Sequence, residues 1–127
     1  MNNPQYMSGT GNNFLVSEYE NSKTDIEIIS IVADSLFDID GVIYVEKIDS
    51  LTVKMHYYNN DGSTAELCVN GIRCVAKYAL DNSIVDSNEV TVVAPIGNIK
   101  TNIKENTVSI EVSTPSYEEN KLLIDGL

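Results

Sequence analysis

The stretch DGSTAELCVNGIRCVAKYAL, residues 61–80, predicts a tight turn followed by a helix, with Cys68 placed where the turn ends. The helix signal is a set of apolar residues at i, i+3, i+4 and i+7: Ile72, Val75, Ala76 and Ala79. The segment from Asn70 to Leu80 is apolar on more than one side, which is typical of a helix wrapped by a sheet. Cys68 therefore stands at a predicted helix start.

A cysteine at a helix start meets a distinctive chemical environment. The helix dipole and the N–H groups at that end favour the thiolate, so the pKa falls below the usual value of about 8.5. The same N–H groups suit a carboxylate. A base beside a carboxylate holder fits removal of a proton from the carbon next to a carboxylate, as in amino-acid racemisation. The alternative is that Cys68 is a small buried hydrophobic residue, the commoner role of a single cysteine.

Strand and turn signals fill most of the remaining chain. A second helix is predicted in residues 21–37, capped by Ser22 or Thr24, with one apolar stripe made of Ile26, Ile29, Val32, Ala33 and Leu36. Strands are predicted at residues 13–19, 41–48, 51–59, 89–95, 98–103 and 107–113. The predicted fold class is α+β, with a mostly antiparallel sheet wrapped around a central helix in one domain over residues 1–127.

Composition limits the classes of partner and the compartment. Eight Lys and Arg against 19 Asp and Glu give a formal net charge of −11, which disfavours nucleic acid and anionic membranes as partners. No apolar run reaches the roughly 18 residues of a membrane span, and the first residues lack the pattern of a signal peptide, so we expect a cytoplasmic protein. Cys68 and Cys74 lie six positions apart, on different helix faces, and are expected to be two reduced thiols.

Three segments together resemble the N-terminal half of diaminopimelate epimerases, in the family's order and at nearly its spacing. They are SGTGNNF at 8–14, DGVIYVE at 40–46 and NNDGSTAELCVNGIRCVAKYAL at 59–80, the last being close to the family's N-x-D-G-S-x-A-x-x-C-G-N-G-x-R-C. The resemblance implies an isomerase that interconverts LL- and meso-2,6-diaminopimelate in lysine and peptidoglycan precursor biosynthesis. It implies no pyridoxal phosphate, metal or other cofactor, and two cysteines that act as base and acid on opposite faces of the substrate carbon.

The resemblance also assigns roles to particular residues. Cys68 matches the first catalytic cysteine, and Asn12 and Asn59 match asparagines that bind polar groups of the substrate. Asn70 and Gly71 match the helix-start residues whose backbone N–H groups bind the reacting α-carboxylate. Three further residues are expected to be structural: Cys74 in the core, Arg73 in an ion pair and His56 on the surface or in a cross-strand contact.

Departures from the family pattern leave other interpretations open. Val69 stands where the family has glycine, and Asn13 replaces a usual aspartate. The second catalytic cysteine belongs to a C-terminal half that is not in this chain, so the 127 residues alone are expected to be inactive. The alternatives are a non-catalytic binding or assembly module, a related amino-acid racemase, and a homodimer in which two copies share a cleft.

Overall fold

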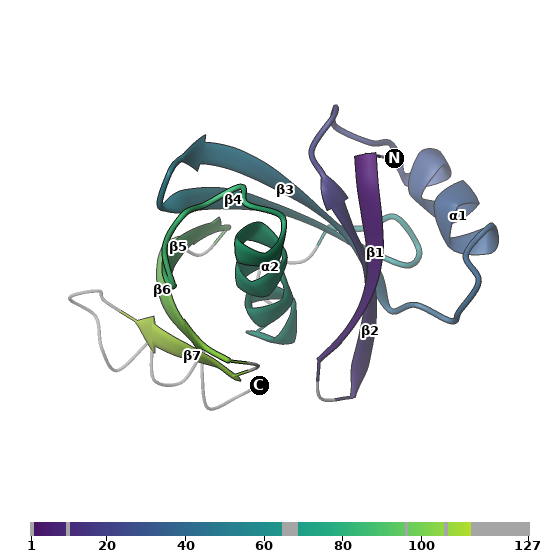
Figure 1. Cartoon of the computed structure of the whole chain (residues 1–127). Helices are drawn as coiled ribbons and strands as arrows, with labels where there is room; N and C mark the ends of the chain where they lie inside the picture. Colours follow the sequence, from purple (N-terminus) through teal and green to yellow (C-terminus); the bar gives the residue numbers. More distant parts are fainter. Residues whose placement is uncertain (1, 10, 65–68, 96, 106, 113–127) are drawn as a thin grey trace.

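The computed structural model describes residues 2–9, 11–64, 69–95, 97–105 and 107–112. In this part of the chain seven strands form one curled sheet in chain order (Figure 1). The strands are β1 (Asn2–Gly9), β2 (Asn12–Glu18), β3 (Gly41–Asp49), β4 (Thr52–Asn59), β5 (Glu89–Ala94), β6 (Gly97–Lys104) and β7 (Thr107–Val112). The helices are α1 (Asp25–Ala33) and α2 (Val69–Asp81).

The sheet is mixed, and its two parallel pairings coincide with the two helices. β2 pairs parallel to β3 after the chain passes through α1, and β4 pairs parallel to β5 after α2. The other four neighbouring pairs are antiparallel. A parallel neighbour requires the chain to cross back along the sheet, and a helix provides that length. The α+β class predicted from the sequence is confirmed, whereas the sequence signals did not reveal the two parallel pairings.

α2 packs against the concave face of the sheet (Figure 1). The four apolar residues that predicted this helix, Ile72, Val75, Ala76 and Ala79, are all buried. Alternate residues of the strands, such as Val16 in β2, Ile43 in β3 and Val92 in β5, complete the same core. Cys74 is buried in this core, as predicted.

α1 covers the opposite face of the sheet, and its predicted apolar stripe is wrong. Thr24 caps the helix, because its side chain accepts from the N–H of Glu27 while the Glu27 carboxylate accepts from the N–H of Thr24. The residue buried against the sheet is Ile28, with Ile31 and Val32 partly buried beside it. Of the five residues in the predicted stripe, only Val32 is partly buried, and four are exposed: Ile26, Ile29, Ala33 and Leu36. α1 is apolar on both sides, so its sequence alone did not identify the packed face.

β1 was not predicted, because its sequence NNPQYMSG carries little strand signal. Contacts with the distant end of α2 hold it in place. The Tyr78 hydroxyl donates to the carbonyl of Asn3 over 2.6 Å, and the Asn82 amide donates to the side-chain oxygen of Gln5 over 2.9 Å. β1 is therefore held both by its antiparallel pairing with β2 and by contacts from the region of α2.

Candidate functional site

Asn12 and Asn70, 58 residues apart in the chain, meet at one end of the sheet. Asn12 is the first residue of β2, and Asn70 lies in the first turn of α2. The Asn70 side-chain amide donates to the side-chain oxygen of Asn12 over 2.8 Å. The structure thus brings together two of the residues that the sequence singled out, one from the sheet and one from the helix start.

Asn59 lies at the same end of the sheet. It is the last residue of β4 and pairs with Gly41, the first residue of β3, which in turn pairs with Phe14 of β2. Since β2 and β3 run parallel and β4 runs antiparallel to them, the starts of two strands and the end of a third coincide there. Three of the predicted polar residues therefore lie at one end of the sheet: Asn12, Asn59 and Asn70.

The turn after Asn59 is fixed by its own hydrogen bonds. The backbone N–H of Asn59 donates to the carbonyl of Ser63 over 2.7 Å, and its side-chain amide donates to the Ser63 hydroxyl over 3.0 Å. The Asp61 carboxylate accepts from the Ser63 N–H and hydroxyl over 2.9 and 2.6 Å. These bonds from Ser63 lower the pKa of Asp61, so the carboxylate form stabilises the turn. The predicted tight turn is confirmed.

Two glycines let the segments of this region approach closely. A Cβ on Gly41 would lie 2.7 Å from the Tyr57 hydroxyl and 2.8 Å from the carbonyl oxygen of Tyr58. Gly62 has a φ of +87°, and a Cβ there would lie 2.5 Å from Cα of Asp25 at the start of α1. The turn that carries Asn59 is therefore packed against the first residue of α1.

Asp40 and Asn60 also form hydrogen bonds at this end of the sheet, and neither residue was predicted from the sequence to belong to the site. The Asp40 carboxylate accepts from the N–H of Asn13 over 2.9 Å, and its own N–H donates to the carbonyl of Asn13 over 2.8 Å. The N–H of Asn60 donates to the carbonyl of Asp40 over 3.1 Å. An acidic residue directly before the glycine that opens a strand was the available signal.

The structure gives the surroundings of three other residues that the sequence singled out: Gly71, Arg73 and His56. Gly71 is buried in the first turn of α2, whereas Cys68 lies outside the described residues. Arg73 is exposed, and its one contact among the described residues is a 3.5 Å hydrogen bond to the Asn70 side chain, so the predicted ion pair is not seen there. His56 is a cross-strand residue, as predicted. Its ring stacks on Tyr19 and lies 2.8 Å from the Glu46 carboxylate.

Two features of the described residues concern metals and membranes. No group of three or more His, Cys, Asp or Glu side chains within them is arranged to hold a metal ion. None of the helices in the described part is long and apolar enough to cross a membrane.

Comparison with known protein families gives a match over most of the chain. The sequence model of the family described as diaminopimelate epimerase matches residues 5–118. The chain belongs to the diaminopimelate epimerase family. The family predicted from the segments at 8–14, 40–46 and 59–80 is therefore confirmed.

Relatives named diaminopimelate epimerase are similar over most of this chain. The protein from Agathobacter rectalis is 41% identical over 109 residues, covering 81% of this chain and 38% of its own length. The protein from Thermotoga maritima is 35% identical over 121 residues, covering 94% of this chain and 50% of its own length. The chain thus spans half or less of the length of these two epimerases.

Solved structures of another group share the fold. A PhzC/PhzF phenazine biosynthesis protein from Clostridium difficile has a TM-score of 0.61 at 11% identity, covering 86% of this chain and 44% of that protein. A PhzF-family protein from Enterococcus faecalis has a TM-score of 0.60 at 14% identity, with 85% and 44% covered. At such low identity the similarity concerns the fold alone.

Val69 is the residue near the predicted site where the resemblance led us to expect a glycine. It is the first residue of α2 and is partly buried. Glycine at such a position would allow the closest approach of a ligand to the backbone, whereas a β-branched side chain fills that space. Val69 therefore bears on how a substrate would meet the helix start.

Proposed function

We propose that this chain is the N-terminal domain of a two-domain, cofactor-independent epimerase that interconverts LL- and meso-2,6-diaminopimelate in the cytoplasm. The observation that carries the proposal is the hydrogen bond between Asn12 and Asn70, at the end of the sheet where Asn59 also lies. It gathers, in a confirmed member of the family, the polar residues that the resemblance assigns to the substrate.

In this proposal each residue has a separate task. Cys68 removes or returns the α-proton on one face of the substrate carbon, and a cysteine of the C-terminal half serves the other face. The backbone N–H groups of Asn70 and Gly71 bind the α-carboxylate, because they lie in the first turn of α2, where the helix dipole favours an anion. The side chains of Asn12 and Asn59 orient the remaining polar groups of the substrate.

The N–H groups that bind the α-carboxylate also stabilise the negative charge that forms when the α-proton leaves. Removing an α-proton places negative charge next to the carboxylate, and hydrogen-bond donors fixed in advance stabilise that charge best as it develops. The thiolate at position 68 is favoured by the same helix end. One helix start thus supplies both a base and the stabilisation that its reaction needs.

A fusion protein tests the proposal. This chain would replace the matching part of the Agathobacter rectalis epimerase, and exchange of the α-proton of diaminopimelate with solvent deuterium would be followed by mass spectrometry. We expect exchange and epimerisation in the fusion, and a fall of about 10²-fold or more on Cys68→Ala, the usual contribution of a general base. Cys74→Ala, a change in the core helix, is the matched control and should retain most activity.

Two results would contradict the proposal. Full activity of the Cys68→Ala fusion would remove the cysteine from the reaction. Rapid epimerisation by the isolated chain would show that no second cysteine from another half is needed.

Val69 favours a second candidate, a domain that keeps the fold and binds an amino acid without turnover. A side chain at the first position of α2 would hinder close approach of the carboxylate. In that case the fusion would bind diaminopimelate without exchanging its α-proton, and Val69→Gly would restore exchange. Exchange with another amino acid in preference to diaminopimelate would instead identify a related racemase.

A further inference from the structure

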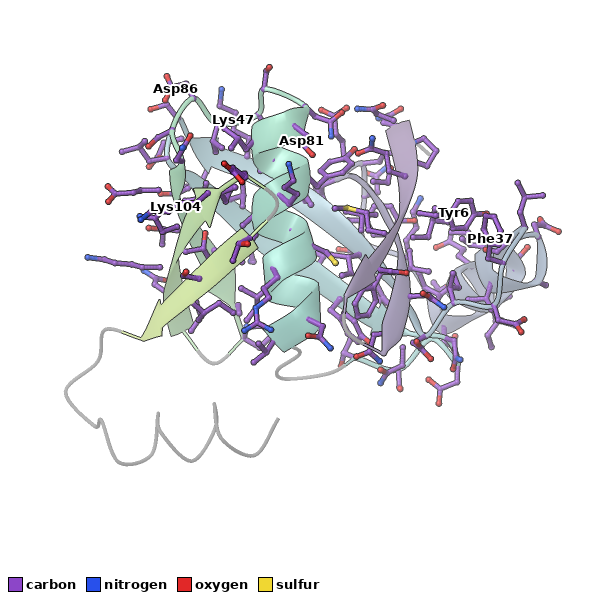
Figure 2. All side chains as sticks on the ribbon, turned by 60° about the horizontal axis from the view of Figure 1, so that its bottom comes forward. Tyr6, Phe37, Lys47, Asp81, Asp86 and Lys104 are labelled. Atoms are coloured by element: carbon purple, nitrogen blue, oxygen red, sulfur yellow. The ribbon has the colours of Figure 1, made fainter. Side chains whose placement is uncertain are left out.

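Three exposed apolar side chains from two separate segments meet beside α1. Tyr6 of β1 is 40% exposed, and Leu36 and Phe37, which follow α1, are 82% and 62% exposed. The rings of Tyr6 and Phe37 pack edge to face with centroids 5.0 Å apart, and the N–H of Leu36 donates to the Tyr6 hydroxyl over 2.9 Å. Figure 2 shows Tyr6 and Phe37 side by side at this end of the molecule. We call these three residues the outer patch.

The outer patch stands between two hollows in the surface. One, of about 330 Å³, lies between Tyr6 and the last turn of α1 and is lined by Ile31 and Asp34 among others. The other, of about 220 Å³, lies between Tyr6, Phe37 and the β1–β2 hairpin. An aromatic pair flanked by hollows offers places for apolar side chains of a partner, and binding energy concentrates at such places.

The exposed side of α1 extends the apolar character. Ile26 and Ile29 are 75% and 48% exposed and lie three positions apart, on one side of the helix. α1 also carries the exposed polar residues Asp25, Glu27 and Ser30, so its outer side is apolar only in part. Scattered apolar residues are ordinary on a surface, but a hydrogen-bonded cluster next to such a helix indicates an interaction site.

Two carboxylates, Asp34 and Asp38, are placed beside the outer patch. The part of the sequence that carries the patch, residues 2–46, is acidic as a whole, with one cation, Lys23, and eight carboxylates. Lys23 lies 3.6 Å from the Glu20 carboxylate and over the ring of Tyr44. Asp34 lines the larger hollow, and Asp38 directly follows Phe37. A second copy of this surface, or an anionic lipid surface, would bring like charges together, whereas Lys and Arg side chains would complement it.

We propose that the outer patch binds a basic, apolar segment of a partner protein, whose apolar side chains enter the two hollows while its Lys and Arg side chains meet the carboxylates of Asp34 and Asp38. Tyr6, Leu36 and Phe37 are not among the residues assigned to the proposed epimerase reaction, although Asn13, which lines the smaller hollow, directly follows Asn12. Substitutions in the outer patch and at Cys68 therefore test different proposals.

Titration with a synthetic amphipathic peptide, LKKLLKLLKKLLKL, tests the proposal by NMR on the ¹⁵N-labelled protein at physiological salt. We expect shifts centred on Tyr6, Leu36 and Phe37, and affinity about tenfold weaker or worse in the double variant Leu36→Ser, Phe37→Ser, because it removes the anchor contacts. The matched control is Ile48→Ser, Leu51→Ser, which removes two apolar side chains that are 52% and 48% exposed on the β3–β4 hairpin. It should bind like the original protein.

Three outcomes would overturn the proposal. Equal weakening by the two double variants would mean that the peptide binds the anionic protein without a site. Equal binding of the acidic peptide LEELLELLEELLEL would remove the role of charge. Sedimentation showing a dimer that the Leu36→Ser, Phe37→Ser change dissociates would assign the outer patch to a second copy. Because all three patch residues are exposed, the variants are expected to fold, and circular dichroism checks this.

Discussion

Tyr44 and Tyr78 are both fully buried, yet their hydroxyl groups have different surroundings. The Tyr78 hydroxyl donates to the carbonyl of Asn3 over 2.6 Å. The Tyr44 hydroxyl is buried with no hydrogen-bond partner among the described residues. A buried polar group without a partner destabilises the folded state, whereas a satisfied one contributes about 0.5–1.5 kcal/mol.

The two tyrosines therefore predict opposite effects for the same substitution. Tyr78→Phe should lower the free energy of unfolding by about 1 kcal/mol, because it removes the bond to β1. Tyr44→Phe should leave it unchanged or raise it by about 1 kcal/mol, because no bond is lost. Urea unfolding of both variants measures this. Equal losses in the two would refute the difference in environment.

The same residues predict a dependence on alkaline pH. Burial raises the pKa of Tyr44 and of Tyr78 to about 12, while a tyrosine in the unfolded chain titrates near 10. The folded state therefore keeps protons that the unfolded state releases. Their contribution to stability is complete below about pH 10 and is lost as the pH rises towards 12. Unfolding at pH 8, 10 and 11 should show this decline, less steeply in Tyr44→Phe, and a flat profile would contradict it.

At the scale of elements, the turn between Asn59 and Ser63 is joined to α1 through Gly62. Gly11 and Gly62 have similar positive φ values, +82° and +87°, but only Gly62 has neighbours within 4 Å of an added Cβ. Gly11→Ala should cost only the strain of the left-handed conformation, about 1–2 kcal/mol. Gly62→Ala should cost about 1–3 kcal/mol more, because the new methyl group meets Asp25. Thermal unfolding compares the two variants, and equal costs would show that the turn is not packed on α1.

Elements with strong local signals were predictable, and those held by distant contacts were not. The turn before Ser63 and the buried face of α2 follow from short-range patterns, and Thr24 was one of the two capping residues that such a pattern offered. The sequence of β1 carries little strand signal, and its position depends on pairing with β2 and on the hydrogen bond from Tyr78, 75 positions away from Asn3. The packed face of α1 was missed for a related reason, since an apolar residue on either side of the helix satisfies the same pattern.

At the scale of the whole molecule, one curled sheet separates two apolar layers. α2 packs within the curl, and α1 lies on the outside (Figure 1). The predicted site residues Asn12, Asn59 and Asn70 lie at one end of the sheet. The parallel pairing of β2 with β3 aligns the starts of these two strands, the antiparallel pairing of β4 brings Asn59 there, and a hydrogen bond joins Asn70 to Asn12. The sequence identified these residues through the family motif, but it did not predict Asp40 and Asn60, whose backbone contacts appear only when the strands are assembled.

The outer patch and the proposed site differ in what the sequence could reveal. The site residues lie in a long motif, whereas Tyr6 and Phe37 come from segments that meet only in the folded chain. Leu36, next to Phe37, was predicted to belong to the buried stripe of a helix, and only the structure shows that it is exposed. Function that depends on a surface assembled from separate segments is in general hidden from local patterns.

Cys68 directly precedes α2 in the sequence, and the proposed reaction requires its thiol to ionise near neutral pH. The rate of alkylation of the native protein by iodoacetamide against pH measures this ionisation, in a Cys74→Ala background so that one thiol reacts. We predict an inflection clearly below the ordinary cysteine value of about 8.5. An inflection at or above about 8.5, or no reaction before unfolding, would contradict the claim.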